Sequence, residues 1–311
     1  MIFTVTLNPA LDKTVVIPRF AAGQVNRIST VRVDAGGKGI NVSKCLHSLG
    51  EATTAAAILA GNAGKELEKM LIEGGITPLV LWVEGQTRTN LKIIDPEQGQ
   101  NTDINEPGPA VTAQQLETLK EMISQQMNPG DLVILSGSLP AGSDVYLYEK
   151  WTAYFKARGA IVLLDADGEA LLHGLKAAPY MIKPNNDELA RLKGTEKLDE
   201  AQMISVGREL LEAGVRDVVI SLGGDGALFL SEAGVYRSEG LKVPVKSTVG
   251  AGDSMVAAMA YGLDRDFSRE EQIALAMAMG AASVMQDGSQ APGCKAVYEL
   301  AHKVVIKKYE E

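Results

Sequence analysis

The sequence predicts an α/β protein with a mostly parallel central sheet, helices on both faces of that sheet, and a smaller separate sheet. Two observations carry this prediction. From residue 40 onwards, short buried strands alternate with helical segments, which is the pattern of a parallel sheet with right-handed crossovers. Two segments rich in Val, Ile, Thr and Arg, residues 15–33 and 84–105, interrupt this alternation. We expect both to form strands of the second sheet.

The elements follow in order from local patterns. The first strand, residues 2–7, is apolar and ends at Asn8-Pro9, a turn signal. The later strands are short apolar runs bounded by turn residues: 53–59, 132–136, 161–165, 180–183, 218–222 and 227–230. The helices have helical apolar spacing or clear start and stop signals: 40–49, 65–72, 113–126, 145–157, 168–173, 186–192, 200–213 and 255–263. Ligands of such sheets bind at the carboxyl ends of the strands.

Composition limits the classes of function. The chain has 311 residues, 46% of them apolar and 22% charged, as in globular proteins. Its net charge of −9 would repel a phosphate backbone, so we expect no nucleic-acid partner. The longest apolar run, residues 273–285, is shorter than the roughly 20 residues of a membrane span. The first twelve residues lack a basic residue and a cleavage site, so we expect no signal peptide and a cytoplasmic location.

Several common chemistries lack their residues. Cys45 and Cys294 belong to no C-x-x-C pattern, so neither a disulfide framework nor a zinc site is indicated. His47, His173 and His302 are isolated from the metalloprotease and serine-hydrolase patterns. The turn after the first strand reads NPALD, whereas a dinucleotide-binding fold has G-x-G-x-x-G there. These absences argue against a hydrolase and against an oxidoreductase.

The strongest local signal is Thr248-Val-Gly-Ala-Gly-Asp-Ser254, which opens an apolar helix. Glycines at the start of a helix leave backbone N–H groups bare, and the helix dipole adds positive potential, so an anion can bind. Asp253 lies at this end, where a carboxylate can cap the helix or accept a proton from an attacking hydroxyl. A plain glycine-rich turn with an N-terminal acid is the structural alternative.

Two further glycine-rich segments accompany it. Residues 35–41 contain three glycines, Lys38 and Asn41, which offer donors to hydroxyls or phosphate. This is no Walker loop, because that motif requires Gly at position 32 and a hydroxyl at position 39. Residues 221–226 follow a strand and form either a plain hairpin turn or a backbone cradle for nucleotide phosphates.

Six segments together carry a family resemblance: TLNPALD, GGKGIN, SGSLPAG, KPNNDE, SLGGDGA and TVGAGDS. Their order and spacing resemble those of the PfkB-type carbohydrate kinases, over essentially the whole chain. The resemblance implies the ribokinase-like fold, a three-layer αβα sandwich in which residues 1–311 form one domain. It also implies a β-sheet lid from insertions at about 12–35 and 84–106, and a homodimer through that lid.

The resemblance assigns roles to individual residues. Asp253 would be the catalytic base, and the N–H groups of Gly250, Ala251 and Gly252 would hold the transferring phosphoryl group. Asp12 and Asn41 would bind sugar hydroxyls, and Arg88, with Arg27, would bind the phosphate already on the sugar. The remaining sugar-pocket residues are Gly36, Gly37, Lys38, Ser136 and Gly137.

The resemblance also implies ATP as co-substrate and magnesium as cofactor. The implied ATP-binding residues are Lys183, Asn185, Ser221, Gly223, Gly224, Asp225, Gly226 and Thr248. Asn185 and Glu188 would organise magnesium through water. The resemblance also admits a potassium ion near Ser247 and Val249.

The implied reaction is phosphorylation of a ketohexose monophosphate, with fructose 1-phosphate giving fructose 1,6-bisphosphate. Tagatose 6-phosphate stays open as the alternative, because turning a ketofuranose ring over nearly exchanges its two hydroxymethyl arms. Arg88 and the TLNPALD opening argue against an unphosphorylated sugar. A non-catalytic sugar-phosphate or nucleotide sensor is disfavoured because Asp253 and the glycines are present. The expected partners are therefore small molecules.

Overall fold

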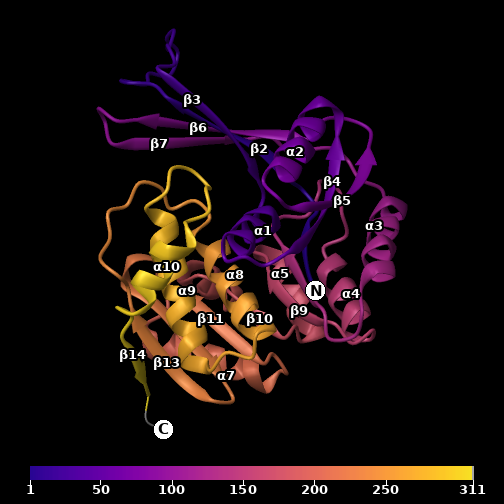
Figure 1. Ribbon diagram of the computed structural model, residues 1–311, viewed down its shortest axis with the longest axis vertical. Helices are drawn as coiled ribbons and strands as arrows, with labels where there is room; N and C mark the ends of the chain where they lie inside the picture. The colour runs from indigo at the N-terminus through magenta and orange to yellow at the C-terminus, as the bar shows by residue number, and fades with distance from the viewer. Residues whose placement is uncertain (310–311) are drawn as a thin grey trace.

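The computed structural model describes residues 1–309 and contains a central sheet of ten strands (Figure 1). The strand order is β14-β13-β12-β11-β10-β9-β8-β1-β4-β5. The strands are β1 (Ile2–Thr6), β4 (Thr53–Ala60), β5 (Thr77–Val83), β8 (Leu132–Ser136), β9 (Ile161–Asp165), β10 (Met181–Ile182), β11 (Asp217–Ser221), β12 (Gly226–Ser231), β13 (Gly234–Glu239) and β14 (Ile306–Lys308). The strands from β11 to β5 are parallel, and β12, β13 and β14 extend the sheet in antiparallel fashion.

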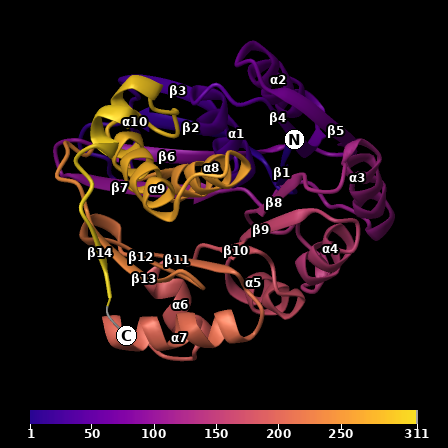
Figure 2. The ribbon, with the colours of Figure 1, turned by 60° about the horizontal axis from the view of Figure 1, so that its bottom comes forward.

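Helices cover both faces of this sheet (Figure 2). One face carries α3 (Ala113–Gln126), α4 (Leu147–Lys156), α5 (Gly168–Gly174), α6 (Asn186–Leu192) and α7 (Glu200–Glu212). The other face carries α1 (Lys38–Ser48), α2 (Gly61–Glu73), α8 (Ala251–Asp264), α9 (Arg269–Val284) and α10 (Cys294–Ala301). Short 3-10 helices follow α5 (η1, Leu175–Ala177) and β11 (η2, Gly223–Asp225). The apolar clusters on both faces confirm the predicted three-layer α/β fold.

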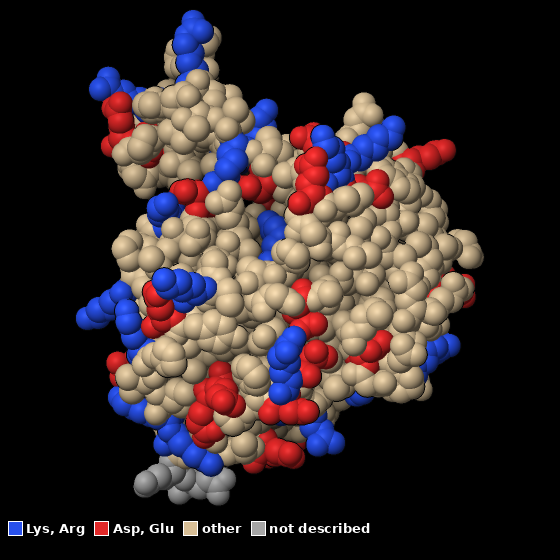
Figure 3. Space-filling model, in the orientation of Figure 1, with Lys and Arg blue, Asp and Glu red and all other residues tan. Residues whose placement is uncertain are grey.

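A second sheet of four strands projects from the body at the top left of Figure 1. We call it the small sheet; its strands are β2 (Ala10–Val16), β3 (Thr30–Gly36), β6 (Arg88–Asp95) and β7 (Gln100–Asn105), in the order β3-β2-β6-β7. The β2–β6 pair is parallel and the other two pairs are antiparallel. Figure 3 shows a hollow between the small sheet and the body, with acidic and basic side chains at its rim.

The structure departs from the predicted elements in several places. Residues 15–33 are no continuous strand, because β2 ends at Val16 and an exposed loop leads to β3 at Thr30. The strands β5, β13 and β14 and the helices α9 and α10 were not predicted. Of these, β5 contains Pro78 and lies at the edge of the sheet with half-exposed side chains, where alternation is weak and proline is tolerated.

The longest apolar run of the sequence lies in α9, which packs against α8 and α10 in the core. Within residues 1–309, no helix has both the length and the apolar character needed to cross a membrane.

Candidate active site

The carboxyl ends of the parallel strands meet at one edge of the central sheet, and several predicted motifs follow them. Ser136 ends β8, Asp165 ends β9, Lys183 directly follows β10, and Ser221 ends β11. These four strands are neighbours in the sheet. Open α/β sheets bind their ligands at such an edge. The fold therefore gathers into one region motifs that lie far apart in the sequence.

Asp253 lies in the first turn of α8, which begins after a glycine in the left-handed region. Gly250 has a φ of 79°, and the amide of Ala251 makes only a long hydrogen bond of 3.4 Å to the Thr248 carbonyl. The Asp253 carboxylate is buried, and its Oδ2 accepts a hydrogen bond of 2.8 Å from Asn41 Nδ2. A proton acceptor thus lies beside the free N–H groups of a helix N-terminus.

The surroundings of Asp253 tune its affinity for a proton. Burial raises the pKa of Asp253 to about 6, and the negative charge of Asp165 adds to the increase. The hydrogen bond from Asn41 and the positive charges of Lys38 and Lys183 lower this pKa but do not cancel the increase. A carboxylate with such a pKa is ionised at pH 7 and is a better base than an exposed Asp.

Asp165, which the sequence analysis did not identify, is the centre of a buried charge cluster. Its Oδ1 lies 3.3 Å from Lys38 Nζ and 3.7 Å from Lys183 Nζ. Burial opposes ionisation of Asp165, but the two lysines outweigh burial and lower its pKa. Burial likewise opposes the charge on Lys38, but Asp165, Asp253 and Glu188 raise its pKa. The available signal was a carboxylate directly after the apolar run of residues 161–164.

Two motif glycines allow close approaches that a side chain would block. A Cβ atom at Gly36 would collide with the Asp12 carboxylate, so this carboxylate packs directly on the backbone of β3. A Cβ atom at Gly252 would lie 2.9 Å from Lys183 Nζ, so the Lys183 ammonium lies over the start of α8. The glycines therefore bring Asp12 and Lys183 into contact with the predicted sugar and phosphoryl sites.

The start of α1 lies beside the end of β8. Gly37 caps α1 with a φ of 118°, and a Cβ at Gly137 would lie 3.7 Å from the Lys38 Cβ. The Tyr148 hydroxyl donates to the carbonyl oxygens of Ser136 and Gly137, at 3.2 and 3.0 Å. Within residues 1–309 the buried Ser136 Oγ has no hydrogen-bond partner. These residues form the floor between the small sheet and the central sheet.

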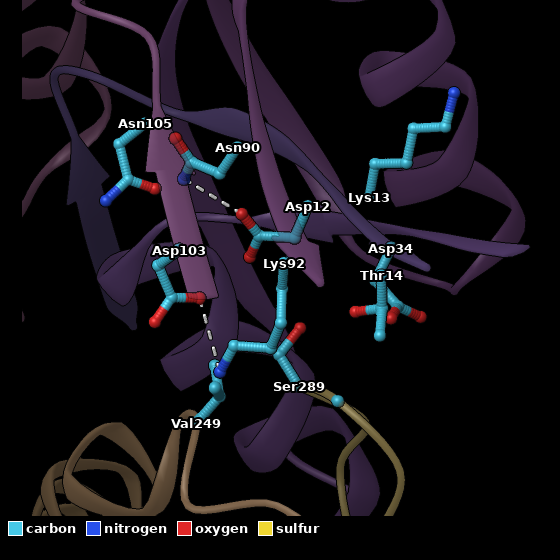
Figure 4. Close-up of a pocket in the computed structure, with 11 residues that line it drawn as sticks. Asp12, Lys13, Thr14, Asp34, Asn90, Lys92, Asp103, Asn105, Val249 and Ser289 are labelled. Carbon is cyan, nitrogen blue, oxygen red and sulfur yellow. Dashed lines mark hydrogen bonds and ion pairs between the residues drawn. The ribbon is translucent and has the colours of Figure 1, made fainter. Parts of the chain in front are cut away.

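A pocket of about 180 Å³ lies between the small sheet and the body (Figure 4). Asp12 Oδ1 accepts a hydrogen bond of 3.0 Å from Asn90 Nδ2, and Lys92 Nζ lies 3.6 Å from Asp103 Oδ1. Burial raises the pKa of Asp12, although Asn90 opposes the increase. Asn90, Lys92 and Asp103 were not predicted from the sequence. The signal for Asn90 and Lys92 is the alternation of polar residues at positions 88, 90 and 92, which places them on one face of a strand.

The two predicted phosphate-binding arginines lie in different surroundings. Arg88 is half-buried, and its Nε and Nη2 donate to the Asn8 carbonyl at 3.2 and 2.9 Å. Its Nη1 donates to the Glu106 carbonyl at 3.4 Å. Arg27 is exposed in the loop between β2 and β3. In residues 1–309 its side chain makes no hydrogen bond or ion pair, so the structure does not bring Arg27 to the other site residues.

A cleft of about 800 Å³ lies on the other side of the α8 N-terminus. Predicted ATP-binding residues that line it are Ser221, Gly223, Gly224, Gly226 and Thr248. Its apolar wall includes Val284 and also Val243, Val245 and Met277, which were not assigned from the sequence. Asp225 does not line this cleft; it lines a neighbouring polar pocket with Glu200 and Arg237.

The KPNNDE segment places a carboxylate at the start of α6. Asn185 and Glu188 form a capping box, in which Asn185 Oδ1 accepts from the Glu188 amide at 2.7 Å and Glu188 Oε2 accepts from the Asn185 amide at 2.9 Å. Asn185 also forms a β-bridge with Ser221, which joins this segment to the nucleotide cleft. Residues 1–309 contain no cluster of three or more His, Cys, Asp or Glu side chains suited to a metal ion.

The chain matches the family model described as the pfkB family carbohydrate kinase over residues 5–295. The chain belongs to the PfkB family of carbohydrate kinases. It is 41% identical over 276 residues to a 1-phosphofructokinase of Xanthomonas campestris, covering 87% of this chain and 86% of the relative. It is 35% identical over 287 residues to a 1-phosphofructokinase of Bacillus subtilis, covering 92% of this chain and 93% of the relative.

Solved structures agree. The phosphofructokinase-2 of Escherichia coli in complex with fructose-6-phosphate superposes with a TM-score of 0.91 at 27% identity, over 97% of this chain and 98% of that chain. The same enzyme in complex with potassium gives a TM-score of 0.92 at 28% identity, over 97% and 98% of the two chains. The predicted family, ribokinase-like fold and enzyme class are therefore confirmed, and the PfkB kinase described here transfers phosphate to a carbohydrate hydroxyl.

Proposed function

We propose that this PfkB kinase transfers the γ-phosphoryl group of ATP to the 6-hydroxyl of fructose 1-phosphate and forms fructose 1,6-bisphosphate. The observation that carries the proposal is the position of Asp253 between two pockets. Asn41 holds the carboxylate on the side of the small sheet, and Lys183 lies over Gly252 on the side of the nucleotide cleft. The names of the relatives that are 41% and 35% identical support fructose 1-phosphate as the substrate.

The chemistry follows from the charges at the α8 N-terminus. The 6-hydroxyl oxygen attacks the γ-phosphorus, its bond to the phosphorus forms, and the bond from the γ-phosphorus to the bridging oxygen of ADP breaks. Asp253 accepts the hydroxyl proton and later releases it to water. The N–H groups of Gly250, Ala251 and Gly252, together with Lys38 and Lys183, stabilise the negative charge on the transferring group.

The acceptor sugar binds in the pocket under the small sheet. Asp12, fixed by Asn90, and Asn41 hold ring hydroxyls. Arg88 offers a planar fork to the 1-phosphate. Its contacts with the Asn8 and Glu106 carbonyls orient that fork at the start of β6, the strand that also carries Asn90. This geometry supports a phosphorylated substrate.

The donor phosphates and magnesium would be held on the other side of Asp253. The buried Asp165 Oδ2 has no hydrogen-bond partner in residues 1–309, and a carboxylate oxygen is the ligand type that magnesium prefers. Asp165 and Glu188 would therefore hold magnesium through water, while Asn185, whose oxygen already caps α6, positions Glu188. When bound, magnesium neutralises charge on the phosphates. Potassium near Ser247 and Val249 stays a prediction, as does the cytoplasmic location.

We further propose that residues 1–311 act as one kinase domain, with the small sheet as its lid and as a homodimer interface. The polar face of the small sheet lines the pocket. The opposite face is apolar, and its Val31 and Ile104 are 54% and 51% exposed. A second copy would cover this face and bring Arg27 to a neighbouring site. Val31→Glu with Ile104→Glu should give a monomer by light scattering, whereas an unchanged mass would contradict the interface.

The product identifies the acceptor hydroxyl. With fructose 1-phosphate and magnesium-ATP, phosphorus NMR should show a new ester at carbon 6 and stoichiometric ADP. A phosphate on a ring hydroxyl, or ADP without a sugar ester, would contradict the proposed pose. Faster turnover of tagatose 6-phosphate would make the chain a tagatose-6-phosphate kinase with the same machinery.

A further inference from the structure

Lys44 joins three segments that are separate in the sequence. It lies on α1, and its Nζ donates to the Ala35 carbonyl at 2.8 Å, near the end of β3. The same Nζ donates to the Ser289 carbonyl at 2.8 Å and lies 3.2 Å from the Ser289 Oγ. Ser289 is buried in the loop between α9 and α10. A single amine therefore ties the small sheet to a loop of the body.

Each end of this tie reaches a residue of the proposed reaction. On the small-sheet side, Ala35 precedes Gly36, whose backbone packs against the Asp12 carboxylate. On the body side, a Cβ at Gly250 would lie 4.0 Å from the Ser289 Cβ, so Ser289 packs against the residue that directly precedes α8. Lys44 thus lies between the sugar-binding carboxylate and the N-terminus of the helix that carries the base.

Helix α1, which carries Lys44, also contacts the start of α8 at two other points. Asn41, one turn before Lys44 on α1, donates to Asp253 and shares a helix face with Lys44. Cys45 Sγ lies 3.3 Å from Ser254 Oγ, which in turn donates to the Gly250 carbonyl at 2.8 Å. α1 is therefore a rigid element against which the start of α8 is placed.

A second contact joins β3 to the same loop. A Cβ at Gly288 would collide with the Arg32 guanidinium, so that guanidinium lies directly over the loop backbone. Arg32 Nε donates to Asp34 Oδ2 at 2.8 Å, which fixes the guanidinium on the inner face of the small sheet. The small sheet meets the loop at two points, and the Lys44 ammonium makes hydrogen bonds at one of them.

We propose that Lys44 is a positioning residue for phosphoryl transfer, which sets the end of the small sheet and Asp12 in register with the start of α8 and Asp253. The inference rests on the proposed function, because it concerns the distance between bound sugar and base. Only a long side chain with several donors reaches both carbonyl groups from α1. Without it the two carbonyls lose their partner and the sheet end is free to shift, and a shift of about 1 Å in a reacting pair costs about 10²-fold in rate.

The test compares Lys44→Met, which keeps the stem and removes the donors, with Lys44→Arg, which keeps donors. Lys120→Met is the matched control, because Lys120 is a buried lysine, paired with Glu117 on α3, on the opposite face of the sheet. We expect Lys44→Met to lower kcat with the sugar phosphate by about 10- to 10²-fold and to leave the KM for ATP within twofold. Lys44→Arg should recover most of kcat, and Lys120→Met should keep the wild-type kcat.

Hydrogen exchange gives a readout that needs no substrate. In Lys44→Met, amides of Thr30–Gly36 and of residues 285–291 should exchange faster together, whereas Lys120→Met should leave both unchanged. If the wild type phosphorylates no sugar but this exchange pattern appears, the proposed function is wrong, whereas the structural role of Lys44 in joining the small sheet to the loop is supported. If Lys44→Met does not fold, Lys44→Gln, which is shorter and keeps only one amide donor group, should still speed exchange in Thr30–Gly36. A folded Lys44→Met with kcat within twofold of wild type, or a folded Lys44→Gln with unchanged exchange, overturns the proposal.

Discussion

Replacement of Asp253 by Asn tests the proposed base directly. Asn has nearly the same shape and can accept the hydrogen bond from Asn41, but it cannot accept the hydroxyl proton. A positioned proton acceptor contributes about 10²–10⁴-fold to the rate, which corresponds to about 3–5 kcal/mol of transition-state stabilisation. We expect kcat, measured as ADP release with saturating sugar phosphate and magnesium-ATP, to fall by that factor.

Ligand binding should survive in Asp253→Asn, because the pocket residues are unchanged. The matched control is Asp264→Asn, an exposed carboxylate at the other end of the same helix, which should keep the wild-type kcat. Calorimetry with ATP should give similar dissociation constants for both variants and the wild type. A kcat of Asp253→Asn within tenfold of the wild type, in protein that binds ATP normally, would refute the base assignment.

The same substitution should stabilise the fold at neutral pH. Burial raises the pKa of Asp253 from 3.8 to about 6, so the native state binds the proton more tightly than the unfolded state. The free energy of unfolding therefore decreases as the pH rises from about 4 to 6. Above pH 6 the buried, ionised Asp253 continues to destabilise the native state by the full amount. At about 1.4 kcal/mol per pKa unit, Asp253→Asn removes a cost of up to about 3 kcal/mol at pH 8. Urea unfolding at that pH checks the sign, and a destabilised variant would contradict it.

The remaining predictions concern pH, the phosphate clamp and the charge cluster. The wild-type kcat/KM should fall tenfold per pH unit below about pH 6, as Asp253 takes up its proton, and a flat profile down to pH 5 would be inconsistent with this base. Arg88→Ala should raise the KM for the sugar phosphate at least tenfold and leave the KM for ATP unchanged. An unaltered KM for the sugar phosphate would contradict the proposal that Arg88 binds its phosphate. Asp165→Asn leaves Lys38 and Lys183 without their carboxylate and should lower the free energy of unfolding by about 3–5 kcal/mol. A change of less than about 1 kcal/mol in urea titrations would contradict a stabilising role of Asp165 in this charge cluster.

The sequence predicted those elements whose signals are local. The bounds of β8, β9, α3 and α6 agree with the predicted segments, because each is a short apolar run or a helix with clear start and stop signals. Strand β5 was not predicted because it contains a proline and its half-exposed side chains do not alternate between apolar and polar. The loop between β2 and β3 was not predicted because its Val25 and Ile28 resemble strand residues, although they are 85% and 53% exposed.

The site shows the same division between local and long-range signals. Family motifs brought Asp253 and Asn41 into one prediction, and the structure joins them across 212 residues by one hydrogen bond. Asp165 lies in no quoted motif, and its partnership with Lys38 spans 127 residues. Lys44 reaches Ser289 across 245 residues. No periodicity of the chain encodes such pairs, because they arise only when the strands are ordered in the sheet.

The substrate comparison tests the central claim most directly. ADP release with magnesium-ATP is measured against fructose 1-phosphate, fructose 6-phosphate, tagatose 6-phosphate and free fructose, and the kcat/KM values are compared. The proposed function predicts that fructose 1-phosphate is preferred at least tenfold over each of the others. Equal or faster turnover of free fructose, or no turnover of any sugar phosphate by protein that binds ATP, would contradict it.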